Sequence, residues 1–308
     1  MTNLERALLR EPPICALLPI RPLAQVPHRN AGSVPGRLCL GRGPPSGPGY
    51  LVHVWTAWWH TWAVPPRRSY LICSVQRAGS WLLCHALEDS GVLGRPAEYF
   101  HRGDEPFWRG RWRISGAASE DAFLRAVQRQ PVTPNGVWGA KMMWNYLDDA
   151  VARLRAWPRL DIAPGAADPD VLAAAIAGLG YVWLRREDKL RQAISWWRAA
   201  AAGQYGLAPG EAPAGPPAFD RDEIGRLLRY AQACEAGWRD WFTAHSIRPL
   251  EIVYEDLIQD VDQAARNVAG FLGVPWPAGL VPVRPRMRRQ ADHHTERLAA
   301  LFNRHGGP

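Results

Sequence analysis

Two clusters of residues in this chain of 308 residues have the chemistry of an anion-binding site. The first is Ser74-Val-Gln-Arg-Ala-Gly-Ser80, where Arg77 supplies a fixed cation, Gly79 permits close approach of the backbone, and Ser80 lies near a helix start. A loop between a strand and a helix binds phosphates because free backbone N–H groups and the helix dipole converge there. The GxxxxGK[ST] pattern is absent, which disfavours magnesium-dependent nucleotide hydrolysis. A strand, a turn and a helix with these residues also occur as plain structure.

The second cluster follows a short apolar run at residues 181–184 and begins with Arg185 and Arg186. The helix predicted after it carries Lys189, Arg191, Ser195 and Arg198. In open α/β sheets, ligands bind at the carboxyl ends of the strands, so Arg186 and Ser195 are candidates for holding a second phosphate. The alternative is a solvated arginine face on a surface helix.

Short apolar runs predict the strands that must position these clusters. Residues 69–75 form such a run and lead directly into the first cluster, which makes the first half of a βαβ unit. Residues 137–142, 181–184 and 250–254 are further strand candidates. Because helical patterns separate them, we expect an α/β fold with a mostly parallel sheet and helices on both faces.

Two helices are predicted from apolar spacings of three and four residues. The first presents one face made of Ile224, Leu227, Leu228, Ala231, Cys234, Trp238, Trp241 and Phe242. The second follows Asp260 and turns inward Val261, Ala265, Val268 and Leu272. Residues 203–217 contain eight glycines and prolines, which predicts a loop that either covers a site or is a tolerated insertion.

The net charge of +8 belongs mostly to the N-terminal segment. Residues 1–68 contain eight arginines against Glu5 and Glu11, a surplus of +6, which leaves +2 for the other 240 residues. The folded body therefore has no basic stripe, and we expect no nucleic-acid partner. Only two of the 37 basic residues are lysines, a bias that indicates a GC-rich bacterial genome.

Residues 1–68 are predicted to be a flexible extension rich in proline and arginine, with the functional domain at residues 69–308. A partner-binding arm, a membrane-surface anchor and a mis-assigned start are the alternatives. The longest apolar run, residues 50–64, is shorter than the roughly 20 residues of a membrane span, so no integral span is expected. Five cysteines without CxxC spacing predict neither disulfides nor a zinc site, which suits the cytoplasm.

Taken together, these stretches resemble the Stf0-type sulfotransferase family. Residues 69–80 are similar to the family's strand and 5′-phosphosulfate loop. The likeness continues, in order and with similar spacing, through residues 90–100, 133–145, 184–199, 235–242, 254–257, 271–273 and 289–292. It covers about residues 69–295, and a collinear series of this length is more specific than any single motif.

The resemblance implies a P-loop-like three-layer α/β sandwich. It also implies a sulfotransferase that moves a sulfuryl group from 3′-phosphoadenylyl sulfate (PAPS) to a hydroxyl of a carbohydrate or glycolipid, without a metal and with a homodimer as the expected assembly. The donor's 5′-phosphosulfate would lie on Gln76, Arg77, Ala78, Gly79, Ser80 and Trp81. Arg186 and Ser195 match the family's 3′-phosphate region. Trp81 departs from the hydroxyl residue that the family usually has there, which puts one phosphate contact in doubt.

The resemblance also places the family's general base at Glu98, with Arg77 offsetting charge on the leaving group. From the residues alone His101 is an equal candidate base, and Lys141 is either a second active-site cation or a lysine closing a strand. Nearby aromatic residues suit either stacking on a sugar or the core: Tyr99, Phe100, Phe107, Trp108 and Trp112. The rival functions are a noncatalytic relative in which Trp81 blocks the donor, and a P-loop kinase or other nucleotide phosphotransferase, which lacks its GK[ST] motif here.

Overall fold

The computed structural model describes residues 68–203, 217–280 and 293–304. Arg68 is thus the only described residue of the predicted N-terminal extension. Almost all of the predicted loop at 203–217 lies outside the described residues, as do residues 289–292 of the resemblance.

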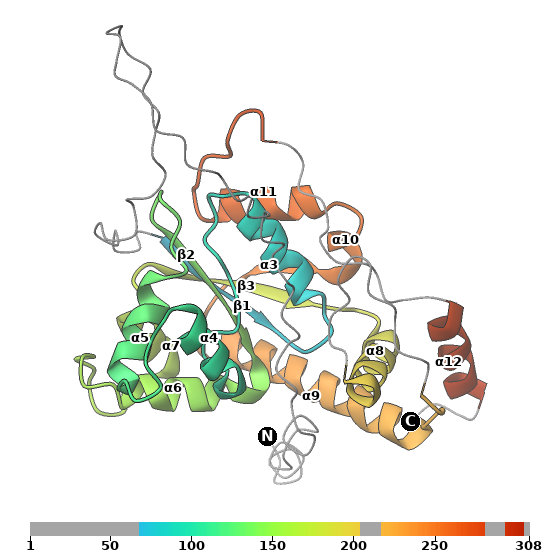
Figure 1. Ribbon diagram of the computed structural model, residues 1–308. Coiled ribbons are helices and arrows are strands. Elements are labelled where there is room, and N and C mark those ends of the chain that lie inside the picture. The colour runs from blue at the N-terminus through green and yellow to red at the C-terminus, as the bar shows by residue number, and fades with distance from the viewer. Residues whose placement is uncertain (1–67, 204–216, 281–292, 305–308) are drawn as a thin grey trace, which may run out of the picture. The chain divides into compact units, whose positions relative to one another are not determined.

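In this described part of the chain, four strands form one parallel sheet in the order β2-β1-β3-β4 (Figure 1). They are β1 (Arg68–Ser74), β2 (Val137–Met143), β3 (Leu179–Arg185) and β4 (Leu250–Val253). β1 lies inside the sheet, with Ile72 paired to Lys141 of β2 and to Val182 of β3. The predicted strands and the parallel sheet are therefore confirmed, although β3 begins two residues earlier than its apolar run suggests.

Helices cover both faces of the sheet, as the sequence predicts (Figure 1). One face carries α3 (Ser80–Asp89), α10 (Tyr254–Leu257) and α11 (Val261–Phe271). The other carries α4 (Glu105–Arg111), α5 (Glu120–Arg129), α6 (Leu147–Arg155), α7 (Asp168–Ala175), α8 (Lys189–Ala202) and α9 (Arg221–Ala244). α12 (His293–Arg304) packs against α8, and short 3-10 turns lie at Arg102–Asp104 and Trp144–Tyr146.

Alternate residues of β1 divide the core between these two layers, because successive side chains of a strand point to opposite faces. Tyr70 and Ile72 pack among the residues of α3 and α11, whereas Leu71 and Cys73 pack on the side of α5 to α9. All eight residues of the predicted face of α9 are buried, and so are the first three of the four inward residues predicted for the helix after Asp260. No described helix has the length and apolar character that crossing a membrane requires.

Four of the described helices begin with a side-chain cap, whereas α3 is among those that do not. Side chains of Ser119, Asp188, Asp220 and Asp260 accept a backbone N–H in the first turns of α5, α8, α9 and α11, respectively. α3 instead follows Gly79, which has a φ of 86° and no side chain to cap the helix. The N–H groups of its first turn are therefore left to an acceptor from outside the helix.

Candidate active site

The loop between β1 and α3 has the backbone shape of an anion cradle. Arg77 and Gly79 both have left-handed backbone angles, with φ of 66° and 86°, while the N–H of Ala78 turns inward to the carbonyl of Val75 at 3.3 Å. Successive N–H groups in such a turn, followed by a helix start, point at one place and favour a negative group. The observed geometry of this loop therefore suits the anion binding that the sequence predicts for it.

Residues from two other segments, α8 and the 3-10 turn after β2, hold this loop in place. Gln192 donates to the carbonyl of Gln76 at 2.7 Å, and the side chain of Gln76 donates to Asn145 at 2.7 Å. Arg77 donates from Nε to the hydroxyl of Ser195 at 3.1 Å. The structure therefore brings the loop and Ser195 together, and it adds Gln192 and Asn145, which the sequence analysis includes only as part of the resemblance.

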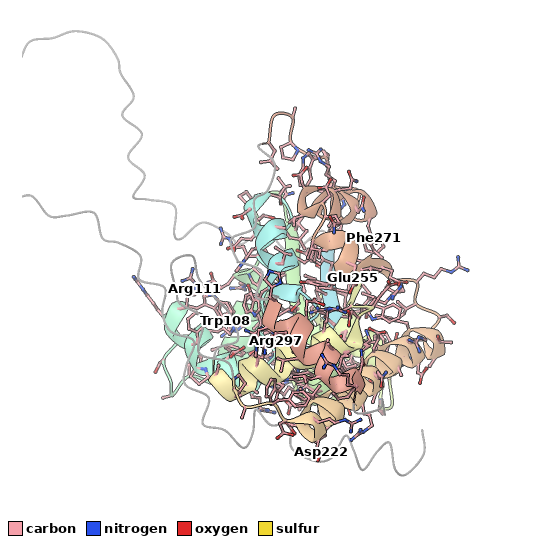
Figure 2. All side chains as sticks on the ribbon, turned by 90° about the vertical axis from the view of Figure 1, so that its right-hand side faces the viewer. Trp108, Arg111, Asp222, Glu255, Phe271 and Arg297 are labelled. Atoms are coloured by element: carbon pink, nitrogen blue, oxygen red, sulfur yellow. The ribbon has the colours of Figure 1, made fainter. Side chains whose placement is uncertain are left out.

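Arg186 is the second predicted cation that reaches the loop. Its guanidinium is buried, donates to the carbonyl of Arg77 at 3.3 Å and lies 4.4 Å from the centre of the Tyr254 ring. Glu255, labelled in Figure 2, lies 3.9 Å from its Nε and also accepts the backbone N–H groups of residues 187 and 188. Arg186 is thus fixed on one side by an aromatic ring and on another by the loop.

Tyr254 also explains why residue 79 is a glycine. A Cβ at Gly79 would lie 2.5 Å from Cδ2 of Tyr254 and 2.9 Å from Cε2, closer than real atoms come. The ring that supports Arg186 therefore packs directly on the turn before α3. Tyr254 is a site residue that the sequence analysis did not single out, except as part of the resemblance.

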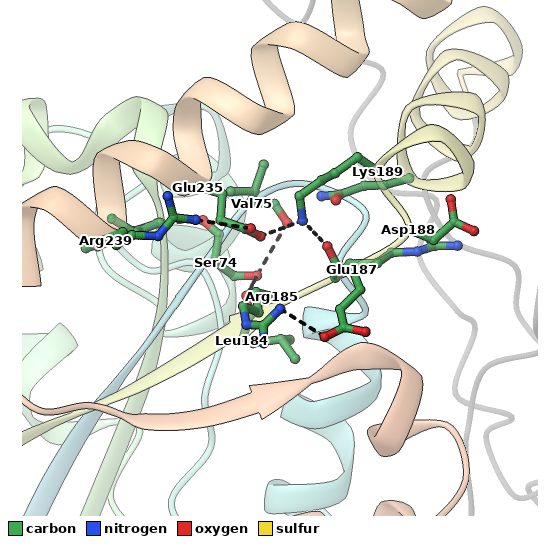
Figure 3. Close-up of polar contacts among 12 residues, drawn as sticks. Ser74, Val75, Leu184, Arg185, Glu187, Asp188, Lys189, Glu235 and Arg239 are labelled. Carbon is green, nitrogen blue, oxygen red and sulfur yellow. Dashed lines mark hydrogen bonds and ion pairs between the residues drawn. The ribbon is translucent and has the colours of Figure 1, made fainter. Parts of the chain in front are cut away.

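The other cations of the second cluster are paired with other residues of the protein. Arg185 is paired with Glu251 and, at 3.3 Å, with Glu187. Lys189 is paired with Glu235 at 2.5 Å and donates to the carbonyl of Arg186 (Figure 3). Arg191 and Arg198, further along α8, bond to residues of α12. The charges of these four residues are therefore compensated by partners within the described structure.

Lys141 lies beside the loop and contacts both Glu98 and Trp81. The Lys141 ammonium lies 2.8 Å from Oε1 of Glu98 and 3.8 Å from the centre of the Trp81 ring. Lys141 is fifth of seven residues in β2 and has no exposed surface, so the alternative of a lysine closing a strand is wrong. A buried ammonium is stable only with compensating partners, which are here one carboxylate and one π face.

His101 lies next to this group but is committed to another partner. Its Nδ1 is 3.3 Å from Asp104, and its ring is 5.2 Å from that of Tyr146. The nearby Asp104 carboxylate raises the pKa of His101 above its ordinary value, against the opposing effect of burial. His101 is thus engaged with Asp104, whereas Glu98 is paired with Lys141.

Glu98, His101 and Asp104 also have ligand atoms within 4.8 Å of one another, a grouping that the sequence does not reveal. Lys141, which is paired with Glu98, already places a positive charge beside these three residues.

The described cysteines do not provide a reactive nucleophile. Cys73, Cys84 and Cys234 are buried, and burial raises the pKa of Cys84 to about 12.

The aromatic residues near Glu98 divide between the core and the surface. Tyr99 and Phe100 are buried in the core beneath α4 and α5, and the Tyr99 ring packs 4.7 Å from that of Trp108. Trp108, labelled in Figure 2, donates from its indole N–H to the carbonyl of Glu98 at 3.2 Å. Stacking on a sugar is therefore not available to Tyr99 and Phe100, whereas Phe107 remains 43% exposed.

A buried arginine fixes the segment that carries Glu98. Arg153 of α6 is paired with Glu105 at 2.7 Å and with Glu120 at 2.5 Å, and it donates to the carbonyl of Phe100 at 3.4 Å. These bonds join α6, α4 and α5 to the chain two residues after Glu98. Local sequence does not reveal this role of Arg153, because its partners are 33 to 53 residues away.

The parallel sheet and the cradle before α3 define an α/β protein with a P-loop-like anion loop. The profile of the Stf0 sulphotransferase family matches residues 69–305, which is most of the chain. The chain therefore belongs to the Stf0 sulphotransferase family, a family of transferases, as the resemblance predicted.

Two similar proteins are trehalose 2-sulfotransferases. The one from Mycolicibacterium smegmatis is 27% identical over 261 residues, covering 77% of this chain and 94% of its own. The one from Mycobacterium tuberculosis is 29% identical over 269 residues, covering 78% and 98%.

Two solved structures are similar over 77% of this chain. A sulfotransferase from Alicyclobacillus acidocaldarius has a TM-score of 0.41 at 16% identity, with 91% of that chain covered. The sulfotransferase domain of the Synechococcus PCC 7002 olefin synthase has a TM-score of 0.38 at 17% identity, with 94% covered.

Proposed function

We propose that the protein transfers a sulfuryl group from PAPS to a hydroxyl of a carbohydrate or glycolipid acceptor. The observation that carries the proposal is the convergence of Arg186 and Ser195 on the loop at residues 76–80, through the bonds to the carbonyl and the guanidinium of Arg77. Two anionic groups of one donor fit this arrangement. The cradle before α3 receives the 5′-phosphosulfate, and Arg186 with Ser195 receives the 3′-phosphate.

The reaction then needs one bond to form and one to break. The acceptor oxygen attacks sulfur, the bond from sulfur to the bridging oxygen of the 5′-phosphate breaks, and adenosine 3′,5′-bisphosphate leaves. Glu98 takes the proton of the acceptor hydroxyl. Arg77 and the start of α3 offset the charge that grows on the departing phosphate, as preorganised cations and N–H groups do in phosphoryl transfer.

The relatives support a sugar acceptor, because both are named trehalose 2-sulfotransferases. Trehalose is therefore the first acceptor to test, followed by glucose and by a glycolipid that carries trehalose. The homodimer and the transferase domain at residues 69–308 stay predictions, to be checked by light scattering and by truncation.

A thermal-unfolding scan with adenosine 3′,5′-bisphosphate tests the donor site before any acceptor is known. A ligand at 100 times its Kd stabilises the folded state by about 2.7 kcal/mol, so the unfolding midpoint should rise. Adenosine 5′-monophosphate is the matched control, since it lacks the 3′-phosphate and should give a smaller rise. Transfer of labelled sulfate from PAPS to trehalose then tests the reaction itself.

The same scan separates the rival functions. A noncatalytic relative with a blocked donor site gives no rise, and a nucleotide phosphotransferase gives a larger rise with ATP than with the bisphosphate. The position of Trp81 argues against a blocked site. Its indole packs against both core clusters and over Lys141, so it points into the protein.

A further inference from the structure

Lys141 has an unusual place for a charged side chain. It lies in the middle of β2, opposite Ile72 of β1, and has no exposed surface. Its neighbours Ala140 and Met142 belong to the core on the side of α5 to α9, so Lys141 points to the face that α3 covers. Burying an ammonium here without partners would destabilise the fold by more than most single contacts stabilise it. The groups that compensate its charge therefore determine where it lies.

Only two partners compensate Lys141 in the described structure, and neither holds it by a directed hydrogen bond. Glu98 lies within ion-pair distance at 2.8 Å, but the alignment is not that of a hydrogen bond. The Trp81 ring, 3.8 Å from the ammonium, covers another side. An ion pair without directional bonds leaves the ammonium able to shift, and an indole face restricts that shift.

We propose that Trp81 is a positioning residue, which holds the Lys141 ammonium against Glu98 and so fixes the carboxylate that accepts the proton. The inference depends on the proposed function only because that function assigns Glu98 as the base for the acceptor hydroxyl. Trp81 is the second residue of α3, directly after the cradle. The first turn of α3 therefore does two things: its backbone faces the donor, and its indole orders the ion pair on the acceptor side.

The contact can be detected without any substrate, because the chain has only two lysines, Lys141 and Lys189. In protein labelled with 13C at the lysine ε-carbon, NMR should show two ε-methylene signals. The ring current of the indole should shift the Lys141 signal upfield of the ordinary lysine position. In Trp81→Leu that shift should vanish, and in Trp81→Phe it should become smaller.

A matched control exists elsewhere in the fold. Trp276 lies under Arg266, with 4.8 Å between the guanidinium and the ring, and neither residue belongs to the site. Trp276→Leu thus removes a similar contact, and it should leave both lysine signals and the turnover number unchanged. A loss in Trp276→Leu equal to that in Trp81→Leu would show general destabilisation and overturn the proposal.

Kinetics with PAPS and trehalose supply the functional readout. We expect Trp81→Leu to lower kcat about tenfold, with Trp81→Phe between it and the wild type. The KM for PAPS and the Kd for adenosine 3′,5′-bisphosphate should stay within about twofold, because the effect passes through Lys141. In a Lys141→Met background, Trp81→Leu should add no further loss.

The outcomes separate this inference from the proposed function. If the wild type binds no adenosine 3′,5′-bisphosphate, the proposed function fails, whatever the lysine signals show. If neither lysine signal is shifted upfield, or if Trp81→Leu lowers donor affinity instead of kcat, the inference fails while the function stands. Should Trp81→Leu not fold, Trp81→Phe decides alone through its reduced upfield shift.

Discussion

Replacing Gly79 with alanine tests whether the turn before α3 is coupled to the residue that supports Arg186. Two costs follow from the structure. A side chain at a φ of 86° costs about 1–2 kcal/mol. The new Cβ would also lie 2.5 Å from Cδ2 of Tyr254, so the ring must move, and overpacking of this kind costs about 1–3 kcal/mol. We therefore expect the free energy of unfolding to fall by about 2–5 kcal/mol.

Gly91 provides the matched control. It also has a left-handed backbone angle, with φ of 68°, but a Cβ there would meet nothing within 4 Å. Gly91→Ala should therefore show the backbone cost alone, about 1–2 kcal/mol. Denaturant unfolding of both variants gives the difference, and Tyr254→Ala in the Gly79→Ala background should remove it. Equal losses for the two glycines would refute the contact with Tyr254.

The displaced ring should also weaken donor binding. The Tyr254 ring lies 4.4 Å from the guanidinium of Arg186, so its movement removes a cation–π contact worth about 0.5–2 kcal/mol. Calorimetry with adenosine 3′,5′-bisphosphate should show a weaker Kd for Gly79→Ala and no change for Gly91→Ala. An unchanged Kd in a folded Gly79→Ala protein would show that Arg186 does not depend on Tyr254.

Four further predictions concern the base, the donor, the pH and the chain's start. Glu98→Gln should lower turnover about 10²- to 10⁴-fold with donor affinity unchanged; full activity there, together with loss in His101→Ala, would make His101 the base. Arg186→Ala should weaken adenosine 3′,5′-bisphosphate and PAPS equally, by about 1.5–3 kcal/mol in calorimetry. Because Asp104 raises the pKa of His101, the protonated form stabilises the fold below about pH 6.5, and this contribution is lost as pH rises through the folded pKa. His101→Gln should therefore cost more in thermal unfolding at acid than at alkaline pH, and the reverse order would refute the assignment. Removal of residues 1–67 should leave the unfolding midpoint unchanged, whereas loss of cooperative unfolding would place them in the core.

The strands could be predicted from the sequence because each is a short apolar run buried on both faces of a parallel sheet. The loop after β1 could be predicted for a similar reason, since a glycine and an arginine between a strand and a helix give a local signal. Tyr254 could not be predicted from the residues alone. It contacts Gly79 from 175 positions later in the chain, and only the packing of α10 against the turn brings them together.

The roles of charged residues are harder to predict than the strands, because the sequence shows where the cations are but not which groups neutralise them. Arg185 and Arg186 are adjacent, yet one is paired with Glu251 and the other faces the loop. Arg185 is the last residue of β3, whereas Arg186 lies in the segment after the strand, so the two side chains have different surroundings. Lys141 shows the same limit. Within an apolar run it was predicted to lie on a strand, but nothing near it in sequence identifies Glu98 and Trp81 as its partners.

In the proposed reaction, the strand order separates the residues assigned to the donor from the residue assigned as the base. β1 lies between β2 and β3, so its loop is flanked by Lys141 on one side and by Arg186 on the other. Cations that suit the donor thus come from β1 and β3, whereas Glu98 is held from the side of β2. Sulfuryl transfer requires this separation, because the acceptor must approach sulfur from the side opposite the leaving phosphate. The proposed base is paired with Lys141 beside β2, whereas Arg186 faces Glu255 at 3.9 Å, so each of these cations has a carboxylate of its own.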